Sequence, residues 1–368
     1  MPDTSVKVYR SSDAGAPSLS GTAGALIGVL QILVDGYGSV TVDSLVVASD
    51  VATATVSGGH QFTMIGDTGP VIRISGASPG GLNTDVRITV TSPTQFTFAT
   101  SGISDQTATG TISAKRAPAG YSWLYTGTNK GVLKRDAMET TGMVLRIDDS
   151  PAQYPTLIMY ESMTDVDTGS GPAPTSGSLW FGKSSAANGT ARDWVLIADP
   201  QAFYLFCKSD GGSWYSNLFF GDPLSFYSAD AYQATLIAHY SASYTSGPLH
   251  LLNATNGMLM AREKTQTGAA ISVRQRSHLV SGASIGSAGA SYTEGVDPFF
   301  CSPVNLWNAS GSVCRALMPG LYSPLHPYTA FTQGQIIEDL PNLSGRTLWM
   351  QKLFGNYVAS MDMTGPWR

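Results

Sequence analysis

The chain has 368 residues and a formal net charge of −5, and only 13% of its residues are charged, which is about half the share usual in soluble domains. It also holds 40 glycines and 20 prolines, a composition that favours turns and strands over exposed helices. No basic run is present, so nucleic-acid binding has no electrostatic support. The length allows two or three domains with a sizeable core, and we expect a mainly β protein.

The N-terminus carries no export or membrane signal that we can identify. MPDTSVKVYR is polar and does not resemble a signal peptide. The longest apolar run, ALIGVLQILV at 25–34, is about half the length that crosses a bilayer. We therefore expect synthesis in the cytoplasm without insertion into a membrane.

Residues 1–45 are expected to form a strand–helix segment that packs with the main domain. VKVYR is typical of a strand, and the next apolar positions recur at helical spacing over 22–34. Ser20 is the predicted N-terminal cap, and glycines end the helix. A further strand is predicted in SVTVDSLVV. The apolar face of the helix and the glycines that end it are Leu26, Val29, Leu30, Leu33, Gly36 and Gly38.

Residues 46–116 are expected to form a small inserted module. Five runs alternate apolar and polar residues with the period of a strand, and GDTGP, GASPGG and TSPT separate them as turns. His60, Asp67 and Asp85 belong to these turns and have no partners at a spacing that suits chemistry. The pattern predicts a small five-stranded β-barrel or sandwich, with its strands at 51–56, 71–75, 86–91, 95–99 and 109–114.

Residues 117–368 are expected to form a large β-sandwich-like main domain. Many of its strand-like runs, DWVLIADPQAFYLFCK among them, are apolar at every position, which predicts a sheet covered on both faces. LHLLN and AISVRQRSHLV are further strand candidates. Two long loops at 165–178 and 281–295 are rich in small or polar residues, and such loops often make contacts.

The residue types that carry catalysis or bind metal do not form a complete set. GASIG places Ser284 in a GxSxG pattern, but the flanking strand and helix of a hydrolase elbow are missing. Glu161, Asp165 and Asp167 lie close enough to suggest calcium, yet the full ligand spacing is absent. We therefore expect solvated carboxylates in a turn, and the same for Asp148 and Asp149, while a calcium ion near Asp165 and Asp167 stays an open question.

The histidines, cysteines and aromatic residues favour structural roles. No histidine pair has the spacing of metal ligands, and three cysteines without a CxxC pair suggest free buried thiols. Aromatic runs such as FYLFC are expected in the core or at a subunit interface, although exposed rings could stack on carbohydrate. The residues concerned are His60, His239, His250, His278, His326, Cys207, Cys301 and Cys314.

Long stretches of the sequence resemble a family of tailed-bacteriophage virion proteins that are described as hypothetical or structural. The likeness begins with VKVYRSSDAGAPSLSGTAGALIGVLQILVDGYGSVTVDSLVVA and continues through LRIDDS, YESMTDVDTGSGPAPT, ARDWVLIADPQAFYLF and FFGDPLSFYSADAY, so it covers most of the chain. It implies a structural virion component, associated with the tail, baseplate or neck, that assembles symmetrically with itself and with other virion proteins. The family supplies no catalytic residues, cofactor or metal.

The module at 51–114 also resembles the small β-barrel insert found in phage tail and baseplate proteins, which is similar to the half-domain insert of ubiquitin-activating enzymes. GHQFT, VIRISGA, LN and QFTFA carry this likeness. It concerns shape only, because no catalytic cysteine lies in the segment. Three alternatives stay open: an adhesin for a host glycan or pilus, a head decoration protein, and a hydrolase, for which Ser284, Glu161 and Asp165 would be the candidate residues.

Overall fold

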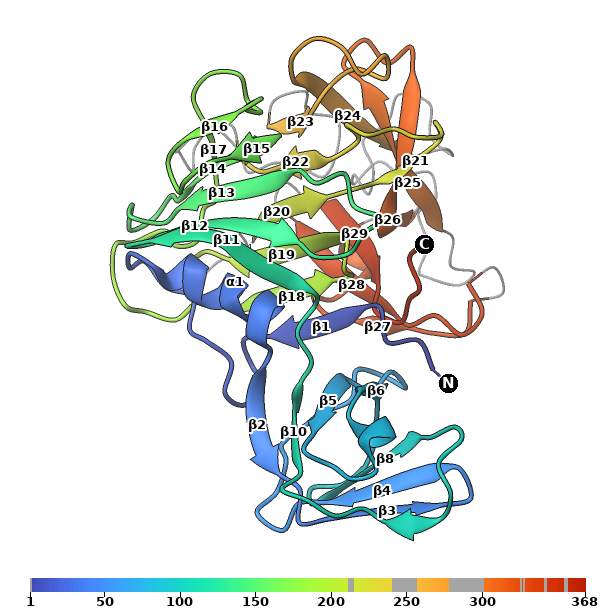
Figure 1. Ribbon diagram of the computed structural model, residues 1–368. Coiled ribbons are helices and arrows are strands. Elements are labelled where there is room, and N and C mark those ends of the chain that lie inside the picture. The colour runs from blue at the N-terminus through green and yellow to red at the C-terminus, as the bar shows by residue number, and fades with distance from the viewer. Residues whose placement is uncertain are drawn as a thin grey trace.

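The protein is mainly β, as predicted, and its strands build one large body with a smaller module below it (Figure 1). The computed structural model describes residues 2–210, 215–239, 257–277, 301–324, 326, 328–340, 343–353 and 357–368. Within these ranges there is one α-helix, α1 (Ala25–Asp35), and two short 3-10 turns, η1 (Gly80–Leu82) and η3 (Tyr328–Ala330). No described helix has the length and apolar character that crossing a membrane requires.

The main body is built on a long, curled antiparallel sheet. Its first strand comes from the N-terminus and pairs with a strand near residue 195. In spatial order the strands are β1 (Lys7–Arg10), β18 (Trp194–Ala198), β19 (Ala202–Lys208), β20 (Tyr215–Gly221), β22 (Thr235–Ile237), β23 (Met258–Met260), β24 (Ile271–Ser277), β25 (Cys301–Asn308), β26 (Cys314–Pro324), β29 (Tyr357–Asp362), β28 (Leu348–Leu353) and β27 (Ile336–Ile337), with β21 (Leu224–Ser225) beside β26.

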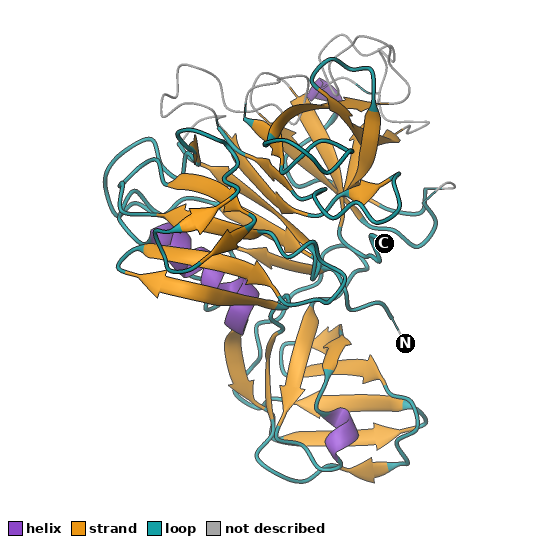
Figure 2. Cartoon of the chain, turned by 45° about the horizontal axis from the view of Figure 1, so that its top comes forward, coloured by secondary structure: helices purple, strands orange, loops and turns teal. Residues whose placement is uncertain are grey.

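A second sheet and α1 cover one face of the large sheet (Figure 2). Its order is β11 (Tyr121–Gly127), β12 (Lys130–Arg135), β13 (Val144–Asp148), β14 (Thr156–Tyr160) and β17 (Leu179–Trp180), and a small hairpin joins β15 (Ser162–Met163) to β16 (Gly169–Ser170). The other face of the large sheet packs against its own curled second half. The main body is therefore sandwich-like, with two cores that share the strands β18, β19, β20 and β22.

Strand β19 shows why its sequence is apolar at nearly every position. Phe203 and Leu205 point into the core beneath α1 and the second sheet, whereas Tyr204 and Phe206 point into the core on the opposite face. All four are at most 2% exposed. The expectation of a sheet covered on both faces is confirmed here, because alternate side chains of a strand face opposite sides.

Helix α1 is confirmed, but its predicted cap is wrong. Its four predicted apolar residues are all fully buried, and Gly36 takes the C-terminal cap position. The N-cap is Gly24, which has a left-handed backbone and no capping side chain, while the Ser20 hydroxyl pairs with that of Thr22. The first free N–H groups are satisfied from another part of the chain, by Asp149.

The module below the main body is a sandwich of two small sheets around a single apolar core. One sheet is β2 (Tyr37–Thr41), β10 (Ser113–Arg116), β5 (Val71–Ser75) and β6 (Asp85–Arg87); the other is β7 (Thr89–Ser92), β8 (Gln95–Ala99), β4 (Val51–Thr55), β3 (Ser44–Ala48) and β9 (Gln106–Thr107). The sequence predicted too few strands. β2 lies before residue 46 and β3 begins before it, so neither was among the five predicted strands. The predicted run at 86–91 is divided between β6 of one sheet and β7 of the other.

Candidate functional site

The carboxylates at 165 and 167 are already satisfied by the protein. Asp165 Oδ1 accepts the backbone N–H groups of Asp167 (2.7 Å) and Thr168 (2.8 Å), which is a local turn, and these bonds lower the pKa of Asp165. Asp167 pairs with Arg146 and with Lys130 (2.9 Å), and hydrogen bonds to these two cations lower its pKa. Both side chains therefore support the expected turn with solvated carboxylates.

Glu161 does not join these two aspartates. Its carboxylate forms a forked pair with the guanidinium of Arg262, at 2.6 and 2.7 Å, and Arg262 also stacks over the ring of Tyr232. Across the described part of the chain, no three His, Cys, Asp or Glu side chains are grouped so that they could hold a metal ion.

Asp149 differs most from its predicted role as a solvated turn residue. Its side chain is fully buried and in contact with the equally buried side-chain nitrogen of Lys183. The second carboxylate oxygen, Oδ2, accepts the N–H groups of Leu26 (2.6 Å) and Ile27 (3.2 Å) at the start of α1. Neighbouring Asp148, by contrast, accepts the N–H of Ser150 as a turn residue should. Nothing local in RIDDSP distinguishes the two.

The histidines that the structure describes are packed, as expected. The Phe62 N–H donates to Nδ1 of His60 (2.9 Å), so Nε2 of this neutral ring carries the hydrogen and donates to the Ser92 carbonyl (3.0 Å). Burial lowers the pKa of His239 to about 4, and His326 lies edge-on to Phe331. His250, His278, Ser284 and the loop at 281–295 lie outside the described residues.

Burial raises the pKa of all three cysteine thiols. Cys207 and Cys301 are buried and free, as predicted, whereas Cys314 is partly exposed. Burial raises the pKa of the Cys207 thiol far above its usual range and that of Cys301 to about 12, and it also raises that of Cys314. Because the thiolate is the reactive form, these three residues are poor nucleophiles.

An open groove of about 430 Å³ lies between β28 and the end of the large sheet that β1, β18, β19 and β20 form. Two half-buried rings, Trp349 and Tyr215, line it together with two amides. The amides of Gln333 and Gln351 bond to each other (3.1 Å), and the indole N–H of Trp349 donates to Gln351 (3.3 Å). Charged residues of both signs, Arg10, Asp193 and Lys208, also line the groove.

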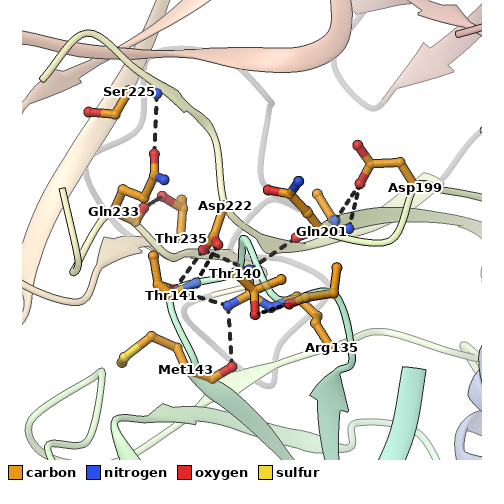
Figure 3. A network of polar contacts seen from close by, with 12 residues as sticks. Arg135, Thr140, Thr141, Met143, Asp199, Gln201, Asp222, Ser225, Gln233 and Thr235 are labelled. Atoms are coloured by element: carbon orange, nitrogen blue, oxygen red, sulfur yellow. Dashed lines mark hydrogen bonds and ion pairs between the residues drawn. The ribbon is translucent and has the colours of Figure 1, made fainter. Parts of the chain in front are cut away.

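A buried polar network links the end of β12, in the second sheet, to the residue that directly follows β20 in the large sheet (Figure 3). Arg135 and Asp222 form an ion pair at 2.6 Å, and neither side chain has exposed surface. Thr141 donates from its N–H and its hydroxyl to the same carboxylate, both at 2.8 Å. Arg135 also donates to the carbonyls of Gln201 (3.0 Å) and Met143 (3.3 Å). Except for Arg135 Nε, which is buried without a partner, the network is held by internal bonds, which is typical of a structural joint.

Arg87 fastens the module to the main body. Its guanidinium donates to the carbonyls of Asp3 (2.7 Å), Val6 (3.1 Å) and Thr364 (2.9 Å) in the main body, and to Gly69 (2.8 Å) in its own module. One side chain thus holds both ends of the chain against the module, using charge-assisted hydrogen bonds.

A second joint forms around Asp13, in the loop before α1. Its carboxylate accepts from Arg10 (3.0 Å), from Arg116 at the end of β10 (2.9 Å) and from the hydroxyl of Tyr37 (2.9 Å). The side chains of Asp13 and Arg116 are 1% and 4% exposed. Because the chain enters the module at β2 and leaves it at β10, this joint fixes both connections.

The far face of the module carries no charged side chain on its strands. This outer face belongs to the five-stranded sheet, at the end of the module farthest from the main body (Figure 1). Val46 and Val51 are 39% and 43% exposed there, and Val46 pairs across the sheet with Thr53. The residues at its outward positions are Ser44, Val46, Ala48, Val51, Thr53, Thr55, Thr89, Gln95, Thr97, Ala99 and Thr107.

Aromatic residues are exposed at a place that the sequence did not indicate. The loop at 165–178 contains no ring, and the aromatic runs FYLFC and LFF are buried. Phe226 and Tyr227, which follow β21, are 52% and 37% exposed.

Comparison with known proteins does not assign the chain to a family: no protein-family model matches the chain, and no curated protein matches its sequence.

Proposed function

We propose that the chain is a structural component of a tailed-phage virion, associated with the tail, baseplate or neck, and that it acts by symmetric assembly with itself and with other virion proteins. The sequence resemblance supports this function. The two joints at Arg87 and Asp13 support it as well, because they hold a projecting module at a fixed position on a large body.

The outer face of the module is the observation that carries the proposal. A solvated sheet face normally alternates apolar inward residues with charged or strongly polar outward ones. Here the outward positions are threonine, valine, alanine, serine and glutamine. Depletion of charge is what distinguishes the centre of protein–protein interfaces, and a face without charge can be buried at little desolvation cost. The main body would then anchor the module while this face contacts a neighbour.

Mass spectrometry of purified particles tests the function directly. The chain should be present in stoichiometric amounts in virions of the virus that carries its gene, and its absence from them would end the proposal. Val46→Lys places a charge at the centre of the outer face and should reduce incorporation of the chain. Thr190→Lys, at an exposed loop of the main body, is the matched control and should incorporate normally.

A second function, binding of a host-surface glycan, is favoured by the groove beside β28. Rings with an apolar face and accessible amides are suited to stack on a sugar and to bond its hydroxyl groups, and Trp349 and the exposed Gln333 provide both. The full chain on a glycan array should then retain a saccharide that Trp349→Ala loses and that Tyr227→Ala, an exposed ring outside the groove, keeps. Failure of the unaltered chain to retain any glycan would refute this role.

A further inference from the structure

The contact between Lys183 and Asp149 is unusual because an amine and a carboxyl group meet with no exposed surface on either side chain. Asp149 directly follows β13, and Lys183 lies three residues beyond β17. The two strands are separated by β14 in the second sheet. Neither residue lies near the groove or the outer face, so neither proposed function accounts for the pair.

The two oxygens of the Asp149 carboxyl group have different partners. Asp149 Oδ2 accepts the N–H groups of Leu26 and Ile27, at 2.6 and 3.2 Å, while Oδ1 faces the Lys183 amine. The amine also donates to the Thr22 carbonyl at 2.5 Å. Two backbone N–H groups on one carboxyl oxygen, at the positive end of a helix dipole, are the arrangement that stabilises an oxyanion during acyl transfer.

Burial shifts the pKa of both groups in the direction that acyl transfer needs. Loss of solvation raises the pKa of the Asp149 carboxyl and lowers the pKa of the Lys183 amine. Each shift favours the uncharged form, a carboxylic acid beside an amine with a free electron pair. An ion pair removed from water is costly to maintain, whereas an amide in the same place carries no net charge.

We propose that Lys183 and Asp149 join covalently, through an amide bond between Lys183 Nζ and Asp149 Cγ that the folded chain forms by itself. The amine electron pair forms the N–C bond while the carbonyl π electrons move onto Oδ2, where the two α1 N–H groups hold them. Oδ1 then leaves as water and takes with it the carboxylic acid proton and one amine proton. The second amine hydrogen stays on the amide and donates to Thr22. No oxidant, cofactor or metal takes part.

Such a bond would join the end of β13 to the chain just beyond β17, at the edge of the second sheet. It would close the segment 150–182, which contains β14 to β17, into a covalent loop. In the proposed virion role, the cross-link would resist the pulling apart of β13 and β17, and it would survive unfolding of the rest of the chain.

Intact-mass measurement of the purified full chain tests the bond. The unaltered chain should be lighter than its sequence by one water molecule, and Lys130→Arg, which changes a partly exposed lysine that is not part of the pair, should show the same loss. Lys183→Arg and Asp149→Ala should show none. An unaltered chain with the full sequence mass, after prolonged incubation in the folded state, would overturn the proposal.

Peptide mapping separates the cross-link from other dehydration and does not depend on whether the variants fold. Trypsin should leave Lys183 uncut and release residues 147–192 as one peptide, lighter by one water molecule and closed into a ring between Asp149 and Lys183. A succinimide at Asp149 would also lose water but would give linear peptides with cleavage after Lys183. That second pattern would contradict the proposed bond.

Discussion

Replacing Asp222 with alanine should strongly destabilise the main body. The substitution removes the partner of the Arg135 guanidinium at 2.6 Å and the acceptor of two bonds from Thr141, each 2.8 Å. Both members of the ion pair have no exposed surface, so water cannot replace the lost carboxylate. Breaking such a pair costs about 3–5 kcal/mol, and we expect a loss of about 4 kcal/mol in the free energy of unfolding.

Urea unfolding followed by tryptophan fluorescence measures this loss, provided that the dependence on denaturant stays the same in the variant. Asp167→Ala removes an exposed ion-pair partner and should have a much smaller effect. The double variant Arg135→Met, Asp222→Leu removes both charges and should recover most of the lost stability. A loss below about 1 kcal/mol for Asp222→Ala would refute the reasoning that this joint depends on a buried charge.

Three further results follow from burial and backbone geometry. Because the folded pKa of His239, about 4, lies below its unfolded value, stability should fall by about 3 kcal/mol as the pH drops from about 6.5 to 4; thermal unfolding of His239→Gln should lack this part of the dependence. Gly36→Ala should cost about 2 kcal/mol or more, because its φ is +65° and a Cβ would lie 2.0 Å from the Arg116 carbonyl oxygen. Gly28→Ala, in the same helix with nothing within 4 Å, should instead gain up to about 1 kcal/mol in the same unfolding assay. Arg87→Met should speed hydrogen exchange and proteolysis near both chain ends, because it removes the charged donor to three main-body carbonyls. Unchanged exchange near the chain ends would contradict the conclusion that Arg87 holds them against the module.

The sequence predicted elements whose pattern is local and strong. Helix α1 follows from apolar residues at helical spacing, and β19 follows from a run that is apolar at every position. Strands β25 and β26 were missed because Pro303, Pro319 and Gly320 interrupt them, and such residues normally argue against a strand. Register shifts in this pair accommodate them, and that accommodation depends on the partner strand.

The hairpin of β11 and β12 was missed although the sequence does carry a signal for it. Two strand-like runs flank a two-residue connection, Thr128 and Asn129, and Asn129, a residue type common in turns, has a positive φ of 56°. The exposed Phe226 and Tyr227 could not be found in this way. Their run, LSFY, has the composition of the buried aromatic runs, and only the packed structure distinguishes them.

The role of Asp149 shows why a site can escape sequence reasoning even when its residues are noticed. Ser20 is the right residue type to cap a helix, but α1 begins at Ala25, too far along the chain for its side chain to reach the free N–H groups. The cap is supplied by Asp149, 123 positions away from Leu26 in the sequence, and the Lys183 side chain contacts the same carboxyl group. No spacing rule connects three such segments. Because one carboxyl group both caps the helix and binds the lysine, any change in its bonding must alter the start of α1 and the edge of the second sheet together.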